Sequence, residues 1–254
     1  MTVQEILQLI DAIAPFDTQA EFDNSGLLVG NPEEEVTDIL FSLDLTEAVI
    51  DEALVLGAQL IITHHPLMFS PRRRVTEEDY EGRLIRKLIR SDLSLISAHT
   101  NLDQAMGGVN DVLVRLCGVE EVFGEGYLRY GDLPKSVPAW ELSQQVGNAL
   151  NTVVRLMGPG EAMIRRLGVS SGGGSEQWKE AAAQGCDAFL SGEIKHHHAL
   201  EMADHQMVAL ECGHHATEEP GLYALADALQ NALNEVECKV RIYQSAVPAY
   251  AFPQ

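Results

Sequence analysis

Short apolar runs that end in histidine limit what this chain can fold into. Runs of four or five residues, rich in Leu, Ile and Val, are typical of strands buried on both faces of a parallel sheet. Three runs share this pattern: 59–63 before His64 and His65, 93–97 before His99, and 208–211 shortly before His214 and His215. The chain therefore predicts a sheet that carries imidazole groups beyond the ends of several strands.

Helix signals stand between these runs. Helices are predicted over 3–14, 47–56, 81–90, 176–184 and 221–234. Thr2 and Glu5 fit a capping box at the start of the first helix. Asp44 and Thr46 are both suitable caps for the second, and Gly57 is a suitable stop. Alternating strands and helices predict an α/β fold with a largely parallel sheet, in which ligands collect beyond the carboxyl ends of the strands.

The strand-and-helix pattern occurs twice along the chain. Residues 51–65 align with residues 179–193, with Glu, Ala and Gly at matching positions and apolar runs that coincide. Between the two copies, residues 126–160 are irregular and interrupted by Gly and Pro, which predicts a connector. We therefore expect a first α/β half over 1–125 and a related second half over 161–254.

The histidines and nearby carboxylates together predict a site for two divalent metal ions. Imidazole and carboxylate ligands suit zinc, manganese or iron(II). Adjacent residues of an extended strand point to opposite sides, so His64 and His65 are placed to address two ions rather than one. Asp103 or Glu218 can bridge the ions, because a carboxylate has two oxygens. Such a pair of ions activates water in hydrolases.

Further residues are candidates for the remaining metal ligand and for proton transfer. On a helical turn, residues four apart share a face, so His214 and Glu218 converge on one site, although the pattern does not separate His214 from His215. His99 is expected to be an outer partner of the ligands or an acid/base near the activated water. Glu193 is either a catalytic carboxylate or a member of a local salt bridge.

Three other clusters have simpler interpretations. Three helical residues in succession fan around the axis, so histidines 196–198 are predicted to be solvated or capping. The glycine-rich segment 170–175 predicts a tight turn; a phosphate-cradling loop is the alternative, but it lacks the Lys of a P-loop. The arginines 72–74 predict a solvated loop, with contact to a phosphate-bearing substrate as the alternative.

The charge and the apolar content restrict the partners of the chain. Lys and Arg number 17 against 38 Asp and Glu, which gives a formal net charge of −21. Such a chain is repelled by nucleic acid and by anionic membranes. No run reaches the roughly 18 apolar residues of a membrane span, and the first residues carry no positively charged signal segment. The cysteines form no C-x-x-C pair, and a cytoplasmic protein is expected.

Five motifs resemble one known family over nearly the whole chain and in the same order. They are Asp-Asn-Ser-Gly-Leu-Leu-Val-Gly at 23–30, Thr-His-His-Pro-Leu-Met-Phe at 63–69, Ser-Ala-His-Thr-Asn-Leu-Asp at 97–103, Gly-Gly-Val-Asn-Asp at 107–111 and Gly-His-His-Ala-Thr-Glu at 213–218. Together they resemble the Nif-three-like family, whose members often carry the name GTP cyclohydrolase 1 type 2. The resemblance implies two related, intertwined α/β halves with mostly parallel or mixed sheets and a dinuclear metal site in the cleft between them.

The resemblance also implies ligands, an assembly and an activity. The implied metal ligands are His64, His65, Asp103, His214 and Glu218, with His215 outside the set. The implied assembly is a toroidal homohexamer whose metal sites face the interior. The implied function is a metal-dependent hydrolase that acts on a nucleotide or similar small molecule, in the manner of a GTP cyclohydrolase. The alternative is a non-enzymatic, metal-binding homohexameric ring scaffold.

Overall fold

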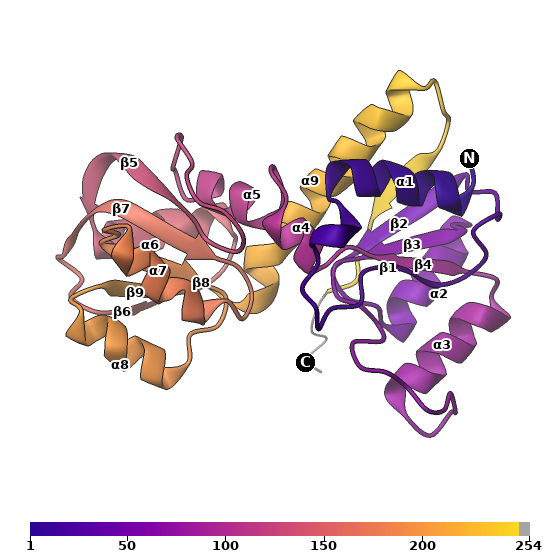
Figure 1. Cartoon of the computed structure of the whole chain (residues 1–254), viewed down its shortest axis with the longest axis horizontal. Coiled ribbons are helices and arrows are strands. Elements are labelled where there is room, and N and C mark those ends of the chain that lie inside the picture. The colour runs from indigo at the N-terminus through magenta and orange to yellow at the C-terminus, as the bar shows by residue number, and fades with distance from the viewer. Residues whose placement is uncertain (249–254) are drawn as a thin grey trace. The chain divides into compact units, whose positions relative to one another are not determined.

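The computed structural model describes residues 1–248, which form two compact units. Unit 1 contains Met1–Ala105 and the chain from Leu222 onward, and unit 2 contains Met106–Gly221. Each unit is built on one five-stranded mixed sheet with helices packed against it (Figure 1). The expected α/β fold with mixed sheets is confirmed.

The sheet of unit 1 has the strand order β1-β4-β3-β2-β10. Its strands are β1 (Gly26–Val29), β2 (Asp38–Ser42), β3 (Leu60–Thr63), β4 (Ser94–Ser97) and β10 (Arg241–Gln244). The pairs β10–β2, β2–β3 and β3–β4 are parallel, and β1 is antiparallel to β4. Every residue of β2, β3 and β4 is buried, as their apolar runs predict.

The helices of unit 1 begin and end where the local sequence specifies. They are α1 (Val3–Ile13), the 3-10 turn η1 (Phe16–Thr18), α2 (Glu47–Leu56), α3 (Tyr80–Arg90), α4 (Thr100–Gln104) and the later part of α9 (His214–Glu235). At the start of α1, Thr2 and Glu5 form both hydrogen bonds of the capping box. Thr46 caps α2, and Gly57 ends it in the left-handed conformation.

The two faces of the unit 1 sheet are covered by different helices. Alternate strand residues, among them Leu40, Ile61 and Leu95, pack with Val49 of α2 and Leu84 of α3 in one hydrophobic cluster. Helix α1 lies on the other side of the sheet from α2 and α3 (Figure 1). Burial on both faces is what a parallel sheet requires, and it leaves the strand ends as the exposed places for function.

The sheet of unit 2 repeats this design. Its order is β5-β7-β8-β9-β6, with strands β5 (Arg129–Pro138), β6 (Arg155–Met157), β7 (Met163–Ser170), β8 (Ala188–Ser191) and β9 (Val208–Glu211). Strands β7, β8 and β9 are parallel, as β2, β3 and β4 are in unit 1. In each sheet an antiparallel strand flanks the last of these three strands, β1 in unit 1 and β6 in unit 2.

The helices of unit 2 again cover both sheet faces. They are α5 (Val109–Leu116), α6 (Ala139–Ala149), the 3-10 turn η2 (Ser175–Gln177), α7 (Trp178–Ala183), α8 (His196–Asp204) and the start of α9 (His214–Glu235), which continues into unit 1. One cluster joins Leu113 and Leu142 of α5 and α6 to the sheet. The opposite cluster joins Trp178 of α7 and Met202 of α8 to it. Within residues 1–248, none of the helices is long and apolar enough to cross a membrane.

The segment expected as a connector is part of the second sheet. Residues 126–160 contain β5, α6 and β6, and β5 pairs with β7 at both of its ends, with an irregularity between Asp132 and Val137. The expected boundaries, 1–125 and 161–254, therefore differ from the compact units, and residues 249–254 lie outside the described part. Gly and Pro interrupt the apolar pattern here without preventing a strand, because β5 is an edge strand.

A buried carboxylate fastens β10 to β2 in unit 1. Asp38 is 2% exposed and accepts hydrogen bonds from the Arg241 guanidinium at 2.8 Å and the Tyr243 hydroxyl at 3.2 Å. Burial alone would raise the pKa of Asp38, but the hydrogen bonds from Arg241 and Thr37 outweigh it and lower the pKa. The ionised carboxylate therefore stabilises the folded state.

We expect Asp38→Asn to lower the free energy of unfolding by about 1–2 kcal/mol at pH 7, because it removes a charge that accepts these hydrogen bonds. A depressed folded-state pKa contributes stability above the unfolded value, about 3.9, and loses it as the pH falls through the folded value. Urea unfolding followed by circular dichroism should therefore show a constant deficit down to about pH 5 and a smaller one below pH 4. Glu33→Gln, at an exposed position, is the control. An equal deficit at all pH values would contradict the role of the charge.

Candidate metal centre

Three histidines of unit 1 meet beyond the ends of β3 and β4. The two strands are parallel, with Thr63 opposite Ser97, so the residues that follow them emerge at one edge of the sheet. The imidazole centroids of His64 and His65 are 5.1 Å apart, and that of His99 is 5.1 Å from His64 and 5.6 Å from His65. One ring nitrogen from each lies within 4.8 Å of the others. The expectation that side chains gather beyond the carboxyl ends of parallel strands thus locates this cluster correctly.

Each ring of the cluster is oriented through Nδ1. The nitrogen lies 2.8 Å from the Ala98 carbonyl in His64, 2.7 Å from Asp44 in His65 and 2.8 Å from Asp23 in His99. Carbonyls and carboxylates only accept here, so Nδ1 donates a proton and Nε2 keeps its lone pair. Metal-binding histidines in proteins characteristically donate their other ring N–H in this way.

Asp103 brings a carboxylate to the first of these rings. It lies on α4, is 7% exposed, and its Oδ1 is 3.5 Å from Nε2 of His64, which is completely buried. Since Nδ1 of His64 is the donor to Ala98, Nε2 and the carboxylate oxygen are two acceptors that face each other. Buried acceptors at this separation repel unless a cation or a proton lies between them. This donor set fits a divalent ion bound by His64 and Asp103.

Asp23 is a site residue that strand and helix patterns do not reveal. Its side chain is fully buried and accepts hydrogen bonds from His99, from the Thr100 amide at 3.0 Å and from the Ser25 hydroxyl at 3.1 Å. Burial would raise the pKa of Asp23, but the bonds from His99 and Thr100 hold it well below its usual range. Asp23 is therefore an anion that orients His99, and its only signal in the sequence is its place in the 23–30 motif.

Asp44 also differs from its expected role. The sequence offers it as a helix cap, but Thr46 caps α2 and the Asp44 carboxylate bonds to His65 instead. A residue directly after a strand and a residue before a helix have the same local signature. Only the parallel neighbour β3, which ends at Thr63, decides between the two roles.

Unit 2 presents a second set at the start of α9. Nε2 of His214 lies 3.1 Å from Glu218, one turn further along the helix, and Nδ1 lies 2.8 Å from Glu193. Glu218 is 4% exposed, so its carboxylate is buried against the ring. Glu193 follows β8 and orients His214, which corresponds to the salt-bridge alternative. A proton-transfer role for Glu193 stays a prediction.

Two glycines make room for this set. Gly172 has a φ of +52°, and a Cβ there would lie 2.0 Å from Oε1 of Glu218 and 3.0 Å from Nε2 of His214. A Cβ on Gly192 would lie 2.7 Å from the Thr217 hydroxyl. The glycine-rich turn therefore serves the close approach of β7 and β8 to the first turn of α9, a function that neither sequence interpretation included.

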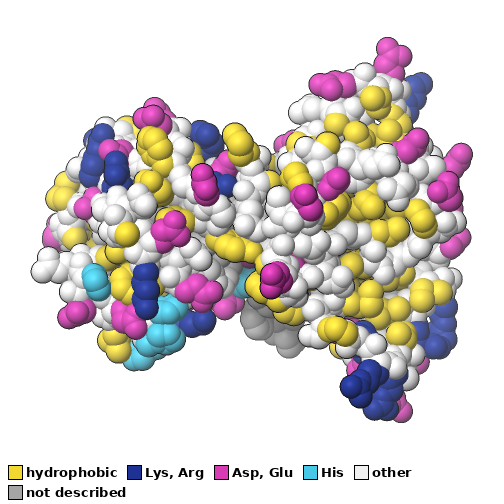
Figure 2. Space-filling model, in the orientation of Figure 1, with side chains coloured by type: hydrophobic (Ala, Val, Ile, Leu, Met, Phe, Trp, Pro, Cys, Tyr) yellow, Lys and Arg dark blue, Asp and Glu magenta, His cyan; other side chains and the backbone are white. Residues whose placement is uncertain are grey.

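The other histidines of unit 2 lie apart from this set. His215 points to Glu219, with 3.6 Å between Nε2 and Oε1, so His214 alone of the pair contacts Glu218. On α8, His198 is buried with Nδ1 2.9 Å from the Ser175 hydroxyl, and burial lowers its pKa. His196 and His197 are exposed, and histidine side chains show on the surface over α8 in Figure 2.

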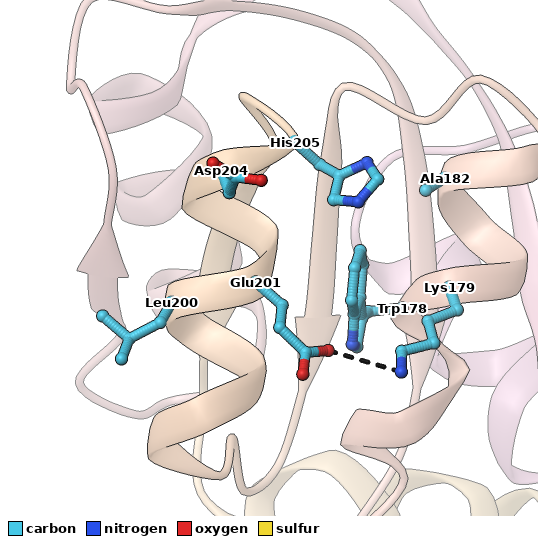
Figure 3. Close-up of a pocket in the computed structure, with 7 residues that line it drawn as sticks. All are labelled: Trp178, Lys179, Ala182, Leu200, Glu201, Asp204 and His205. Carbon is cyan, nitrogen blue, oxygen red and sulfur yellow. Dashed lines mark ion pairs between the residues drawn. The ribbon is translucent and has the colours of Figure 1, made fainter.

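A cavity of about 520 Å³ between α7 and α8 has a different character. Trp178 stands between the helices with the His205 ring beside it, 5.2 Å between centroids (Figure 3). At its rim, Lys179 lies 3.4 Å from Glu201 in an ion pair, and Asp204 adds a further carboxylate. Within residues 1–248, no set of three metal-binding side chains involves this cavity. The strand-end sets are therefore the better candidates for function.

Comparisons with known proteins agree with the resemblance found in the motifs. The model of the Duf34/NIF3 (NGG1p interacting factor 3) family matches residues 1–248. A Clostridium perfringens protein named GTP cyclohydrolase 1 type 2 homolog is 33% identical over 246 residues, which is 92% of this chain and 93% of that protein. NIF3-like protein 1 of Drosophila melanogaster is 29% identical over 248 residues, 92% of this chain and 84% of its own.

Solved structures share the fold. A hypothetical protein of Staphylococcus aureus superposes with a TM-score of 0.94 at 27% identity, covering 100% of this chain and 99% of its own. Reduced HcgD from Methanocaldococcus jannaschii gives a TM-score of 0.81 at 28% identity, covering 97% and 98%. The chain thus matches these proteins over nearly its full length.

Gly172→Ala should disrupt the unit 2 set, because it adds both a backbone conformation unfavourable to L residues and a clash with Glu218. We expect it to lower the free energy of unfolding of unit 2 by about 2–4 kcal/mol. Both tryptophans of the chain, Trp140 and Trp178, belong to unit 2, so their fluorescence during urea unfolding reports on this unit.

Gly173→Ala is the matched control. A Cβ at this neighbouring position meets nothing within 4 Å, and we expect a change within about 0.5 kcal/mol. Equal effects of the two substitutions would show that the close approach to Glu218 does not matter for stability.

Proposed function

The chain belongs to the Duf34/NIF3 family, and from that premise we propose that it is a hydrolase that uses divalent metal ions to act on a nucleotide or a similar small molecule. Two ions per chain are proposed, with zinc, manganese or iron(II) as the metal. The proposed ligands are His64, His65, Asp103, His214 and Glu218. Curated relatives named GTP cyclohydrolase 1 type 2 homolog support GTP as the first substrate to test.

The observation that carries the proposal is that, in each unit, Nε2 of a histidine faces a buried carboxylate. Nε2 of His64 faces Asp103 at 3.5 Å, and Nε2 of His214 faces Glu218 at 3.1 Å. In both histidines, Nδ1 is already committed to an acceptor. Two acceptors that face each other repel unless a cation or a proton lies between them, so this arrangement in both units favours a cation-binding function.

The chain's own residues also provide for proton transfer. Divalent ions at such ligands supply a Lewis acid that generates hydroxide near neutral pH. The buried Asp23 carboxylate accepts a hydrogen bond from Nδ1 of His99 and fixes the orientation of that ring. We propose that His99 takes up or delivers the proton of the reacting water, with Glu193 as the second candidate. Opening of the purine ring of GTP needs such a water to attack its C8 carbon.

A non-enzymatic ring scaffold is the second candidate. Several large apolar side chains are strongly exposed in the single chain, among them Val55 at 87%, Met106 at 91% and Val153 at 90%. Exposed apolar side chains are typical of surfaces that meet another subunit when they form contiguous patches. We propose the homohexamer as the assembly to test by light scattering. A metal-loaded hexamer without turnover of any nucleotide or phosphoester would favour the scaffold.

Metal analysis tests the proposal directly. Untagged protein purified without chelator should contain about two ions per chain by elemental mass spectrometry. His64→Ala should lose at least one ion, and its loss of turnover should exceed the about 10- to 100-fold typical of removing an outer partner. His65→Ala, at a less buried position, repeats the test with a smaller risk to folding.

The control is His197→Ala, an exposed histidine of α8, which should keep both ions and full activity. Absence of bound metal after incubation with zinc, manganese and iron(II), or turnover that survives complete chelation, would rule out the metal-dependent hydrolase.

A further inference from the structure

Two loops of unit 1 enclose a cavity of about 500 Å³ that neither the metal ligands nor the core explains. One loop carries Phe22, and the other carries Phe69, four residues after His65. Both residues line the cavity together with their neighbours on the two loops, residues 21–24 and 68–72. The cavity lies within a single unit, so its geometry is defined by the fold of that unit.

The two phenyl rings are exposed, although large apolar side chains are usually buried. Phe22 is 65% exposed and Phe69 is 47% exposed, and their ring centroids are 6.0 Å apart with 51° between the planes. At this spacing no third ring fits between them, but their outer faces are available for stacking. Aromatic faces accept planar rings in offset or edge-to-face arrangements.

Hydrogen bonds hold the loops that carry these rings. The Asn24 side-chain amide donates to the Met68 carbonyl at 2.7 Å and so joins one loop to the other. On the first loop, the Ser25 amide donates to the Gln19 side chain at 2.8 Å. The exposed rings therefore stand on an ordered frame, which reduces the entropy lost when a ligand stacks on them.

The aromatic pair adjoins the three-histidine cluster. The Phe69 ring is 6.1 Å from the His99 ring, centroid to centroid, in an edge-to-face arrangement at 78°. Phe22 directly precedes Asp23, whose carboxylate orients His99. A ring stacked on this pair would therefore lie beside the candidate acid/base.

The basic residue of the cavity is already paired with carboxylates. Arg72 forms ion pairs with Asp79 and Glu81, so its guanidinium charge is balanced by two carboxylates. A phosphate would compete with both acids for this side chain. The recognition chemistry that the cavity offers is thus an aromatic face rather than an anion-binding site.

We propose that Phe22 and Phe69 form an aromatic platform on which the planar nitrogen heterocycle of the substrate, a nucleobase, stacks beside His99. This inference rests on the proposed function, because it names the part of the substrate that the same site holds. Stacking on protein aromatic rings is tolerant of base identity, since every base has a π face. The platform would place the base next to the group that handles the proton.

Binding of guanosine tests the platform separately from catalysis, with ribose as the probe that lacks the ring. Titration calorimetry on zinc-loaded protein should show guanosine binding at least about tenfold more tightly than ribose. Phe22→Leu and Phe69→Leu, which keep an apolar side chain but remove the ring, should each weaken guanosine binding about tenfold. Phe69→Trp should keep or strengthen it, and metal content should stay unchanged in all three variants.

The matched control is Phe123→Leu in unit 2. Phe123 is 43% exposed and also pairs with an aromatic ring, Tyr130, at 5.9 Å, but it lines no part of this cavity. The Phe123→Leu variant should bind guanosine with the same affinity as the unaltered protein. Unchanged guanosine affinity in both Leu variants, or equal binding of guanosine and ribose by the unaltered protein, would overturn the platform.

Failure of the proposed function gives a different result. Stacking needs no ion, so chelated protein should still prefer guanosine to ribose and still lose that preference in the Leu variants. Such a result, together with absent turnover in zinc-loaded protein, would defeat the hydrolase while supporting the platform. If both Leu variants keep metal-dependent turnover and an unchanged affinity for guanosine, the hydrolase would be supported and the aromatic platform overturned.

Discussion

The parallel register of β3 and β4 is the constraint on which the unit 1 site depends. Thr63 lies opposite Ser97, and their buried hydroxyl groups hydrogen bond at 2.8 Å. His64 follows the first strand and His99 follows the second, so the register decides which side chains meet. A slip of one residue would turn every side chain of a strand to the opposite face. Because both faces of the sheet are buried, core packing fixes the register, and the site gains its geometry from the core.

Local signals account for much of the fold. The capping box of α1 and the Thr46 and Gly57 limits of α2 depend on neighbours in the sequence, and the structure confirms them. The strands β3, β4 and β9 follow from the apolar runs at 59–63, 93–97 and 208–211, which are local signals as well. The region 126–160 does not follow, because β5 pairs with β7, and no residue near β5 in the sequence reveals that partner. Long-range pairing of an edge strand leaves only a weak local pattern.

Only some of the candidate site residues could likewise be predicted from the sequence. The histidines were predictable because strand ends in a parallel sheet gather at one edge. Their orienting groups were not, because Asp23 is 76 residues from His99 and Asp44 is 21 residues from His65. Gly172 was recognised as a turn, but its contact with Glu218 arises only when β7 packs against α9. The groups that orient the candidate ligands are brought to them by tertiary structure, so a single sequence identifies these groups only through resemblance to a known family.

The His-x-x-x-carboxylate motifs of the two units look alike in sequence but differ in geometry. His99 precedes Asp103 by four residues, as His214 precedes Glu218. His214 is the first residue of α9, so the helical i, i+4 relation holds and its ring meets Glu218 at 3.1 Å. His99 instead caps α4 with non-helical angles, φ −107° and ψ −106°, and its ring bonds to Asp23.

Asp103 consequently meets a histidine from a neighbouring strand, His64, rather than the one four residues before it. Helix α4 thus supplies the carboxylate that faces His64, the residue after β3. The ring of His99 remains hydrogen bonded to Asp23 and lies edge-on to Phe69. The difference in helix entry between α4 and α9 therefore gives the two similar motifs different partners, because His99 contacts Asp23 whereas His214 contacts Glu218.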